Sequence, residues 1–312
     1  MSMIKLKPAF KDYVWGGDRL KKDFGKEWAG DVLAETWELS AHPDGPSMIA
    51  SGSFAGKTFP EYLKEKGKAI LGTNAARFQD FPVLIKFIDA RENLSLQVHP
   101  GDEYALRHEG QYGKTECWYI VEAKPGAGLY LGLKERLTRE EFAEKIRQGT
   151  LLESLRFVPV KPGEMYFIHS GTLHAIAAGT LLAEIQQNSN VTYRVYDFGR
   201  LGADGKPRPL HIPQAMDVSD LSGVMPDMDF GGHLAVCPYF LVDGLSFAGE
   251  AELMADGASF CSVLVTEGSG SICFNGEELP FRRGDSFFVE AGSGRGRLRG
   301  KGHVLLTRVP AP

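Results

Sequence analysis

Four side chains that can ligate a metal ion stand at the ends of apolar segments. Gln97 and His99 close one such segment, and because side chains alternate across a strand the two share one face. Glu116 opens a second apolar segment and His174 opens a third. Two imidazoles, one carboxylate and one amide oxygen make a mixed nitrogen and oxygen set that suits zinc or a similar divalent ion. Each residue alone is unremarkable, so the hypothesis depends on a fold that brings all four together.

Positive groups for an anionic small molecule are few. The formal net charge is −5 and no basic run occurs, so we expect no nucleic-acid partner. Lys114 lies two residues before Glu116 and therefore shares its face, while Arg194 offers a planar fork of donors that suits a phosphate group. Two alternatives stay open. Arg194 could form a structural ion pair with Glu184, and Lys86 and Lys114 could be ordinary solvated lysines.

Many short strands must position these side chains. The 37 glycines and 17 prolines are spread through the chain, and between them lie short β-branched or aromatic segments. Regular spacing of such segments favours a mainly β sandwich or barrel over alternating strands and helices. The segments are Phe81–Asp89, Leu94–His99, Cys117–Glu122, Gly128–Leu131, Met165–Ile168, Leu181–Gln186 and Thr192–Tyr196.

Two capping boxes predict helices that pack outside the strands. In each box a threonine precedes a glutamate by three residues, Thr58 with Glu61 and Thr138 with Glu141. Apolar residues at helical spacing follow both. The helical segments are expected near residues 58–78 and 138–155.

A glycine-spaced pattern occurs twice. Gly163–His174 and Gly284–Arg295 both carry a glycine, an aromatic centre and a second glycine at the same spacing, which suggests two copies of one strand–turn–strand unit. In the second copy Arg295 takes the place of His174, and a cationic guanidinium does not ligate a metal as imidazole does. Chance repetition in a glycine-rich chain is the alternative. With the loop-like composition of Ser222–Gly232, the repeat predicts a catalytic domain over 1–232 and a degenerate copy over 233–312.

Composition also bears on the compartment. No apolar run approaches the roughly 20 residues that span a bilayer, and the first ten residues lack the apolar core of a signal peptide. The four cysteines show no Cys-x-x-Cys pair, which argues against both a zinc ribbon and a disulfide framework. We therefore expect a cytoplasmic protein without a membrane partner.

The motifs resemble a known family. Gly163–His174 is similar to the second motif of the cupin superfamily, Gly-x5-Pro-x-Gly-x2-His, with His169 where proline is usual. Seven pieces in order, over most of residues 1–215, extend the resemblance to type I mannose-6-phosphate isomerases in their short bacterial form. The pieces are Pro8–Gly17, Glu35–Ser40, Pro82–Ala90, Leu94–Pro100, Gly113–Tyr119, Gly171–Ile176 and Glu184–Asp197.

This resemblance implies a fold, a cofactor and roles. The fold would be two cupin (jelly-roll) barrels with a small helical insertion. One zinc ion per chain, or another divalent metal, would be held by Gln97, His99, Glu116 and His174. Catalytic roles would fall to Arg194, Lys114 and Glu184, and substrate contacts to Ser95 and Lys86. Three departures affect loop details only: Asn190 stands where Asp is usual, Cys117 where Met is common, and His169-Ser170 where prolines are usual.

The implied reaction interconverts mannose 6-phosphate and fructose 6-phosphate through an enediol. A divalent ion stabilises the developing negative charge, and a positioned base moves a proton between neighbouring carbons. Glu184, Lys114 and a metal-bound water are all candidates for that base. The alternatives are another metal-dependent cupin enzyme, such as an oxygenase, and a non-catalytic sugar-phosphate-binding protein. Oxygenase sites commonly show His-x-His rather than Gln-x-His, and both a monomer and a homodimer fit the sequence.

Overall fold

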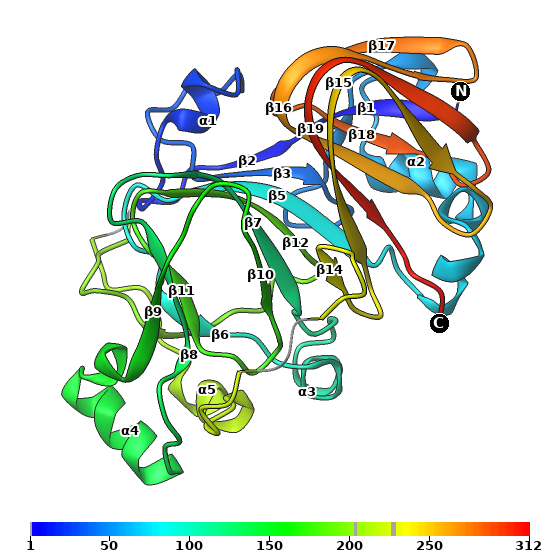
Figure 1. Cartoon of the computed structure of the whole chain (residues 1–312). Coiled ribbons are helices and arrows are strands. Elements are labelled where there is room, and N and C mark those ends of the chain that lie inside the picture. Colours follow the sequence, from blue (N-terminus) through cyan, green and yellow to red (C-terminus); the bar gives the residue numbers. More distant parts are fainter. Residues whose placement is uncertain (1, 203–204, 226–228) are drawn as a thin grey trace.

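The computed structural model describes residues 2–202, 205–225 and 229–312. Within these residues the chain is mainly β, as predicted, and its strands form three antiparallel sheets (Figure 1). None of the three closes on itself, so the expected pair of closed barrels is not confirmed. No helix among the described residues is long and apolar enough to cross a membrane.

Two of the sheets carry the predicted site residues. The six-stranded sheet has the order β10-β7-β12-β5-β3-β2 and the five-stranded sheet the order β13-β6-β11-β8-β9. The first comprises β2 (Ala9–Lys11), β3 (Glu35–Leu39), β5 (Val83–Asp89), β7 (Glu116–Ala123), β10 (Met165–Ile168) and β12 (Thr180–Gln187). The second comprises β6 (Leu96–Val98), β8 (Gly128–Leu133), β9 (Leu155–Pro159), β11 (His174–Ile176) and β13 (Tyr193–Tyr196).

These two sheets pack face to face through an apolar layer. Trp118 and Ile120 of β7 belong to the same buried cluster as Leu129 and Leu131 of β8 and Ile176 of β11. β5 lies between β12 and β3, and all seven of its residues are buried. The polar residues of this central region are therefore held between two rigid layers, away from bulk water.

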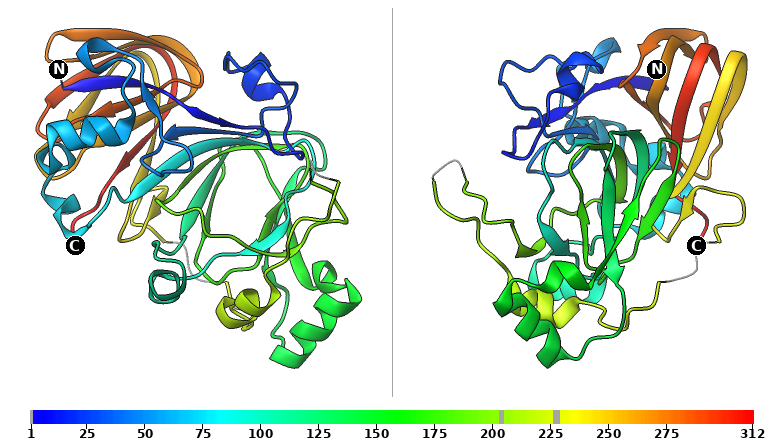
Figure 2. Two further views of the ribbon diagram at one scale, coloured as in Figure 1. Left: turned by 180° about the vertical axis from the view of Figure 1, so that it is seen from behind. Right: turned by 60° about the vertical axis from the view of Figure 1, so that its left-hand side comes forward.

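The third sheet contains the first and the last strand of the described chain (Figure 2). It comprises β1 (Met3–Lys7), β4 (Met48–Ile49), β14 (Ala235–Val236), β15 (Leu241–Ala255), β16 (Cys261–Phe274), β17 (Glu277–Arg282), β18 (Ser286–Val289) and β19 (Gly294–Arg308). β1 pairs with β18 on one side and with β4 on the other. The predicted division at residue 232 stays a prediction, but the first strand of the chain lies in the sheet of the C-terminal region.

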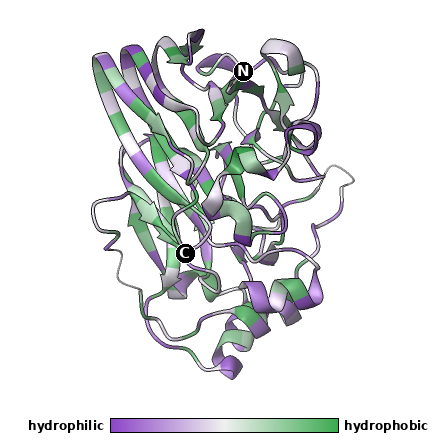
Figure 3. Cartoon of the chain, turned by 90° about the vertical axis from the view of Figure 1, so that its right-hand side faces the viewer, coloured by the Kyte–Doolittle hydropathy of each residue, from purple (hydrophilic) through white to green (hydrophobic). Residues whose placement is uncertain are grey.

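The long strands of this sheet were expected only as short ones. β15 and β19 run antiparallel from Leu241↔Arg308 to Ala255↔Gly294, and Figure 3 shows bands of hydrophobic and hydrophilic residues along these strands. One face covers a second buried cluster that includes Val263, Ile272 and Leu298.

Both predicted capping boxes are present. Thr58 begins α2 (Phe59–Lys66) and Thr138 begins α4 (Arg139–Gln148), and in each box the glutamate side chain accepts from the threonine backbone N–H. Short 3₁₀ turns follow both helices, at 68–71, 73–77 and 151–154. Three further helices were not predicted, and these are α1 (Arg19–Lys22), α3 (Asp102–His108) and α5 (Ile212–Val218).

The repeated glycine pattern falls on equivalent structure. β10 leads through a turn into β11, and β18 leads through a turn into β19. Gly171 and Gly292, in the two turns, have φ values of 87° and 79°, a region that L side chains rarely adopt. His174 is fully buried, whereas Arg295 is exposed and pairs across the strands with Met254.

Candidate active site and metal centre

Strand register aligns the predicted residues in two rows. In the five-stranded sheet Gln97 lies between His174 on β11 and Arg194 on β13. In the six-stranded sheet Glu184 on β12 lies between Trp118 on β7 and Lys86 on β5. Neither row is visible in the sequence, because the paired residues are far apart along the chain.

Three of the four predicted metal ligands converge. The ligand atoms of His99, Glu116 and His174 all lie within 4.8 Å of one another, and all three residues are buried. His174 Nε2 lies 3.4 Å from Glu116 Oε1, and His99 Nε2 lies 3.6 Å from Glu116 Oε2. The carboxylate thus presents one oxygen to each imidazole.

Backbone carbonyls orient both imidazoles. His99 Nδ1 lies 2.8 Å from the carbonyl oxygen of Val191, and His174 Nδ1 lies 2.8 Å from that of Thr172. A carbonyl only accepts, so each ring carries its proton on Nδ1 and turns an unprotonated Nε2 toward Glu116. Burial lowers the pKa of His174 to about 4 and, together with the nearby Lys114, lowers that of His99 well below its usual value. Both rings are neutral near pH 7, the form that ligates metals.

Gln97 lies beside this group. Its amide Nε2 is 3.3 Å from His174 Nε2, and its Oε1 accepts a long hydrogen bond of 3.5 Å from the Ser95 hydroxyl. Rotation of the terminal amide by half a turn exchanges the nitrogen and oxygen positions. The side chain therefore has an oxygen within reach of the imidazole nitrogens.

Three observations test whether a divalent cation fits these residues. Glu116 Oε1 is buried and accepts no hydrogen bond from the described residues, an expensive arrangement for a carboxylate without a cation. Burial raises the pKa of Glu116 to about 7, and the negative charge of the neighbouring Glu184 contributes to this increase. The ammonium of Lys114 contacts the other Glu116 oxygen and lies 3.3 Å from His99 Nε2. The donor set attracts positive charge, and it fits a divalent ion.

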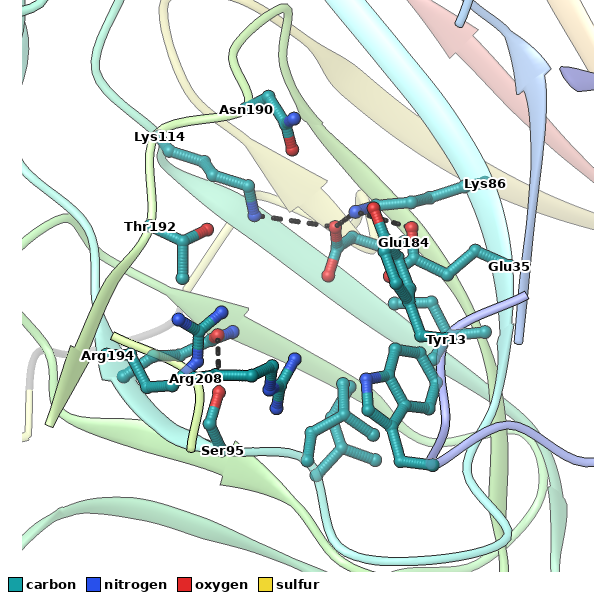
Figure 4. A pocket seen from close by; sticks show the side chains of 15 residues that line it. Tyr13, Glu35, Lys86, Ser95, Lys114, Glu184, Asn190, Thr192, Arg194 and Arg208 are labelled. Carbon is teal, nitrogen blue, oxygen red and sulfur yellow. Dashed lines mark hydrogen bonds and ion pairs between the residues drawn. The ribbon is translucent and has the colours of Figure 1, made fainter. Parts of the chain in front are cut away.

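A cavity of about 250 Å³ adjoins the ligands. Its lining includes every other residue predicted for the site, namely Lys86, Ser95, Lys114, Glu184 and Arg194, as well as Gln97. In Figure 4 the ammonium groups of Lys86 and Lys114 point at Glu184. The guanidinium groups of Arg194 and Arg208 lie together beside Ser95, away from that carboxylate.

Glu184 lies at the end of the cavity next to the predicted metal ligands and contacts the surrounding polar side chains. Its carboxylate lies 2.9 Å from Lys86 Nζ and 3.5 Å from Lys114 Nζ, and it accepts a 2.7 Å hydrogen bond from the Trp118 indole. Burial alone would raise the pKa of Glu184, but Lys114 and Lys86 outweigh it and lower the pKa to about 2. With exposures of 6% for Lys86 and 3% for Lys114, the solvated-lysine alternative is wrong.

The structural pairing of Arg194 with Glu184 is also wrong. Arg194 Nη1 donates to the carbonyl of Pro209 at 2.9 Å, and its Nε is buried without a hydrogen-bond partner among the described residues. The carboxylate of Glu184 contacts the two lysines and Trp118 instead. Arg194 keeps donors available for a ligand in the cavity.

Comparison with known proteins places this chain in a family. The model of the type I phosphomannose isomerase catalytic domain matches residues 3–123, and that of the mannose-6-phosphate isomerase cupin domain matches residues 232–309. Mannose-6-phosphate isomerase ManA of Bacillus subtilis is 37% identical, with 97% of this chain and 98% of the relative covered. The enzyme of Streptococcus mutans is also 37% identical, with 88% of each covered. The chain belongs to the type I phosphomannose isomerase family.

Solved structures agree with this family assignment. The crystal structure of the mannose 6-phosphate isomerase from Bacillus subtilis superposes with a TM-score of 0.91 at 37% identity, covering 98% of this chain and 99% of that one. A mannose 6-phosphate isomerase bound with zinc and yttrium superposes with a TM-score of 0.78 at 18% identity, which shows a shared fold. The predicted resemblance to type I phosphomannose isomerases is confirmed.

Several residues of this phosphomannose isomerase site received no predicted role. Glu35 lines the cavity beside Tyr13, lies 3.5 Å from Lys86 Nζ and accepts a 2.8 Å hydrogen bond from the Trp37 indole. Burial raises the pKa of Tyr13 to about 12, and the negative charge of Glu35 contributes to this increase. Tyr13 and Glu35 both lie in pieces of sequence that carried the resemblance, so a signal existed. Arg208 follows the last of these pieces, and no pattern marked it.

Proposed function

We propose that this protein interconverts D-mannose 6-phosphate and D-fructose 6-phosphate. The observation that carries the proposal is a single cavity with two different ends. One end is lined by Gln97 and Lys114, which contact the buried His99, Glu116 and His174 cluster, and the other by Arg194, whose Nε has no hydrogen-bond partner among the described residues. Family membership and relatives named as mannose-6-phosphate isomerases over nearly the whole chain support the same reaction.

We propose one zinc ion per chain, held by Gln97, His99, Glu116 and His174. Two neutral imidazoles, a carboxylate and an amide oxygen favour zinc over magnesium or calcium, which prefer all-oxygen sites. A bound zinc ion would supply Lewis-acid stabilisation of negative charge on the substrate oxygen. The buried, unpartnered oxygen of Glu116 supports this ligand set.

The protein's own residues would move the proton and hold the substrate. Isomerisation transfers a proton between carbon 2 and carbon 1 of the sugar, which needs a proton-holding group beside both carbons. The Glu184 carboxylate and Lys114 Nζ are such groups at the metal end of the cavity, and they lie 3.5 Å apart. Lys114 and Lys86 keep Glu184 ionised, since burial alone would raise its pKa and favour the protonated acid. Ser95 and Arg194 would bind the substrate at the other end.

Two wider predictions stay with this proposal. The six- and five-stranded sheets would be the two halves of one jelly roll, and the eight-stranded sheet would be the degenerate copy. All four cysteines are free thiols, which supports a reducing, cytoplasmic location.

A coupled assay of fructose 6-phosphate formation, with and without chelator, tests the proposal. Zinc-loaded protein should turn over mannose 6-phosphate, and chelator should stop the reaction until zinc is restored. Absence of turnover in the zinc-loaded protein would rule out the activity. Turnover that persists after complete zinc removal would rule out the metal's role, and oxygen uptake would point to another cupin activity.

A further inference from the structure

We propose that Arg208 is the second cation, beside Arg194, that binds the substrate phosphate, and that Asp197 is the residue that positions it. The inference deepens the proposed function, because it names the residues that would make the cavity specific for a phosphorylated sugar. It also separates the roles of the arginines from those of the lysines.

The guanidinium of Arg208 is fixed by a two-point contact. Arg208 Nε donates to Asp197 Oδ2 at 2.7 Å, and its Nη2 donates to Asp197 Oδ1 at 2.6 Å. This parallel pair uses two of the five N–H groups of the side chain. Arg208 also lines the cavity with Arg194, Ser95 and Thr192. One edge of the guanidinium is therefore anchored, and donors remain for a ligand.

The backbone next to Arg208 also holds Arg194. Pro209, the following residue, provides the carbonyl that accepts from Arg194 Nη1 at 2.9 Å. The His211 backbone N–H donates to the Arg194 carbonyl at 2.8 Å, so this segment runs beside β13. Prolines on both sides of Arg208 restrict its backbone. The two arginines are thus set relative to each other before a ligand arrives, which reduces the entropic cost of binding.

The charges at this end of the cavity are unbalanced. Asp197 is 7% exposed and forms ion pairs with two guanidinium groups. Its Oδ1 lies 2.6 Å from Arg208 Nη2 and 3.5 Å from Arg200 Nη1. Arg200 has a second carboxylate, the half-exposed Glu92, at 3.6 Å. Among the described residues Arg194 has no carboxylate partner: its Nη1 donates to a carbonyl, and its Nε is buried without a hydrogen-bond partner.

At the other end of the cavity the cationic side chains already have buried carboxylate partners. Lys86 and Lys114 face three buried carboxylates, those of Glu35, Glu116 and Glu184. A dianionic phosphate placed there would meet like charges in a buried setting. At the arginine end, the phosphate would meet Arg194, which has no carboxylate partner among the described residues, and Arg208, whose guanidinium is already held in place by Asp197. Paired hydrogen bonds from a guanidinium suit the geometry of a phosphate group. The sugar carbons then extend toward the metal ligands.

Substitutions that alter the fork test the inference. Arg208→Gln removes the charge, Arg208→Lys keeps the charge but loses the fork, and Asp197→Asn weakens the anchor. Arg295→Gln, on the exposed face of β19, is the matched control. For each zinc-loaded protein we would measure KM and kcat for mannose 6-phosphate, and the dissociation constant of inorganic phosphate by calorimetry.

Arg208→Gln should raise KM and the phosphate dissociation constant together, each by about tenfold or more, the effect of losing a charge-assisted hydrogen bond. Arg208→Lys and Asp197→Asn should raise both by smaller factors, with kcat nearly unchanged, and Arg295→Gln should match the parent protein. Unchanged phosphate binding in a folded, zinc-retaining Arg208→Gln or Arg208→Lys protein would overturn the inference. Because calorimetry needs no turnover, phosphate binding that depends on Arg208 in a protein without isomerase activity would count against the proposed reaction alone.

Discussion

Replacing Lys86 with methionine should destabilise the protein because two buried carboxylates would lose a cationic partner. Lys86 is 6% exposed and lies 2.9 Å from Glu184 and 3.5 Å from Glu35. Removing one partner of a buried ion pair typically costs about 3–5 kcal/mol. The lower value applies here, because Glu184 keeps Lys114 at 3.5 Å and each carboxylate keeps a tryptophan N–H donor. We expect a loss of about 3 kcal/mol in the free energy of unfolding at pH 7.

The loss should shrink as the pH falls. In the parent protein, burial raises the pKa of Glu184 but Lys114 and Lys86 bring it down to about 2, so the carboxylate's contribution is complete above about pH 4.5 and is lost toward pH 2. Without Lys86 the pKa of Glu184 rises, and the folded variant takes up protons at higher pH than the folded parent. The variant therefore gains stability relative to the parent as acid is added.

Urea unfolding followed by tryptophan fluorescence at pH 7 and at pH 4 measures both effects. Lys64→Met, an exposed substitution on α2, is the control and should stay within about 0.5 kcal/mol of the parent. A loss below 1 kcal/mol at pH 7, or an equal loss at both pH values, would refute the reasoning.

Three further outcomes follow from the site and its surroundings. His174→Ala should abolish zinc binding and turnover, whereas Arg295→Ala should keep both. Zinc analysis and the coupled assay measure these outcomes. Loss of activity in a folded Arg295→Ala protein would contradict the prediction that the second copy of the repeat is inactive. Zinc at about 1,000 times its dissociation constant should raise the free energy of unfolding by about 4 kcal/mol, and no shift of the thermal midpoint on chelation would contradict the Glu116 site. Burial lowers the pKa of His303, which stacks on Tyr119. Below about pH 6.5 the unfolded chain therefore binds a proton at His303 more readily than the folded chain does, and the free energy of unfolding should fall. Urea unfolding at pH 7 and pH 5.5 measures this fall, which should be smaller in His303→Gln.

Local rules marked the predicted metal ligands and Lys114, whereas Ser95, Lys86 and Glu184 were predicted from the family resemblance. Alternation along a strand places Lys114 with Glu116. A polar residue at the boundary of an apolar segment marked both Gln97, near the end of one segment, and His174, at the start of another. These signals lie within a few residues of sequence. They indicated which side chains face the interior, and the fold then brought His99, Glu116 and His174 within 4.8 Å.

Contacts set by pairing between distant strands were beyond these rules. The alignment of Trp37 with Lys86 across β3 and β5 brings Glu35 to the cavity, and nothing local to either strand specifies it. Arg208 reaches the cavity from a loop, where no periodicity applies. The two alternatives left open by the sequence, solvated lysines and an Arg194–Glu184 pair, could be decided only from the structure for the same reason, since burial and partner choice depend on the facing sheet.

The position of β1 affects the order in which the protein can fold. β1 pairs with β18, and Lys5 forms an ion pair with Asp285, 280 residues later in the chain. Closing so long a loop costs entropy before the contact is gained, which slows folding. During synthesis the buried residues Met3 and Ile4 have no partners on β18 until Val289 has been added to the chain. A fragment that stops at residue 232 would keep every proposed zinc ligand and still lack that partner.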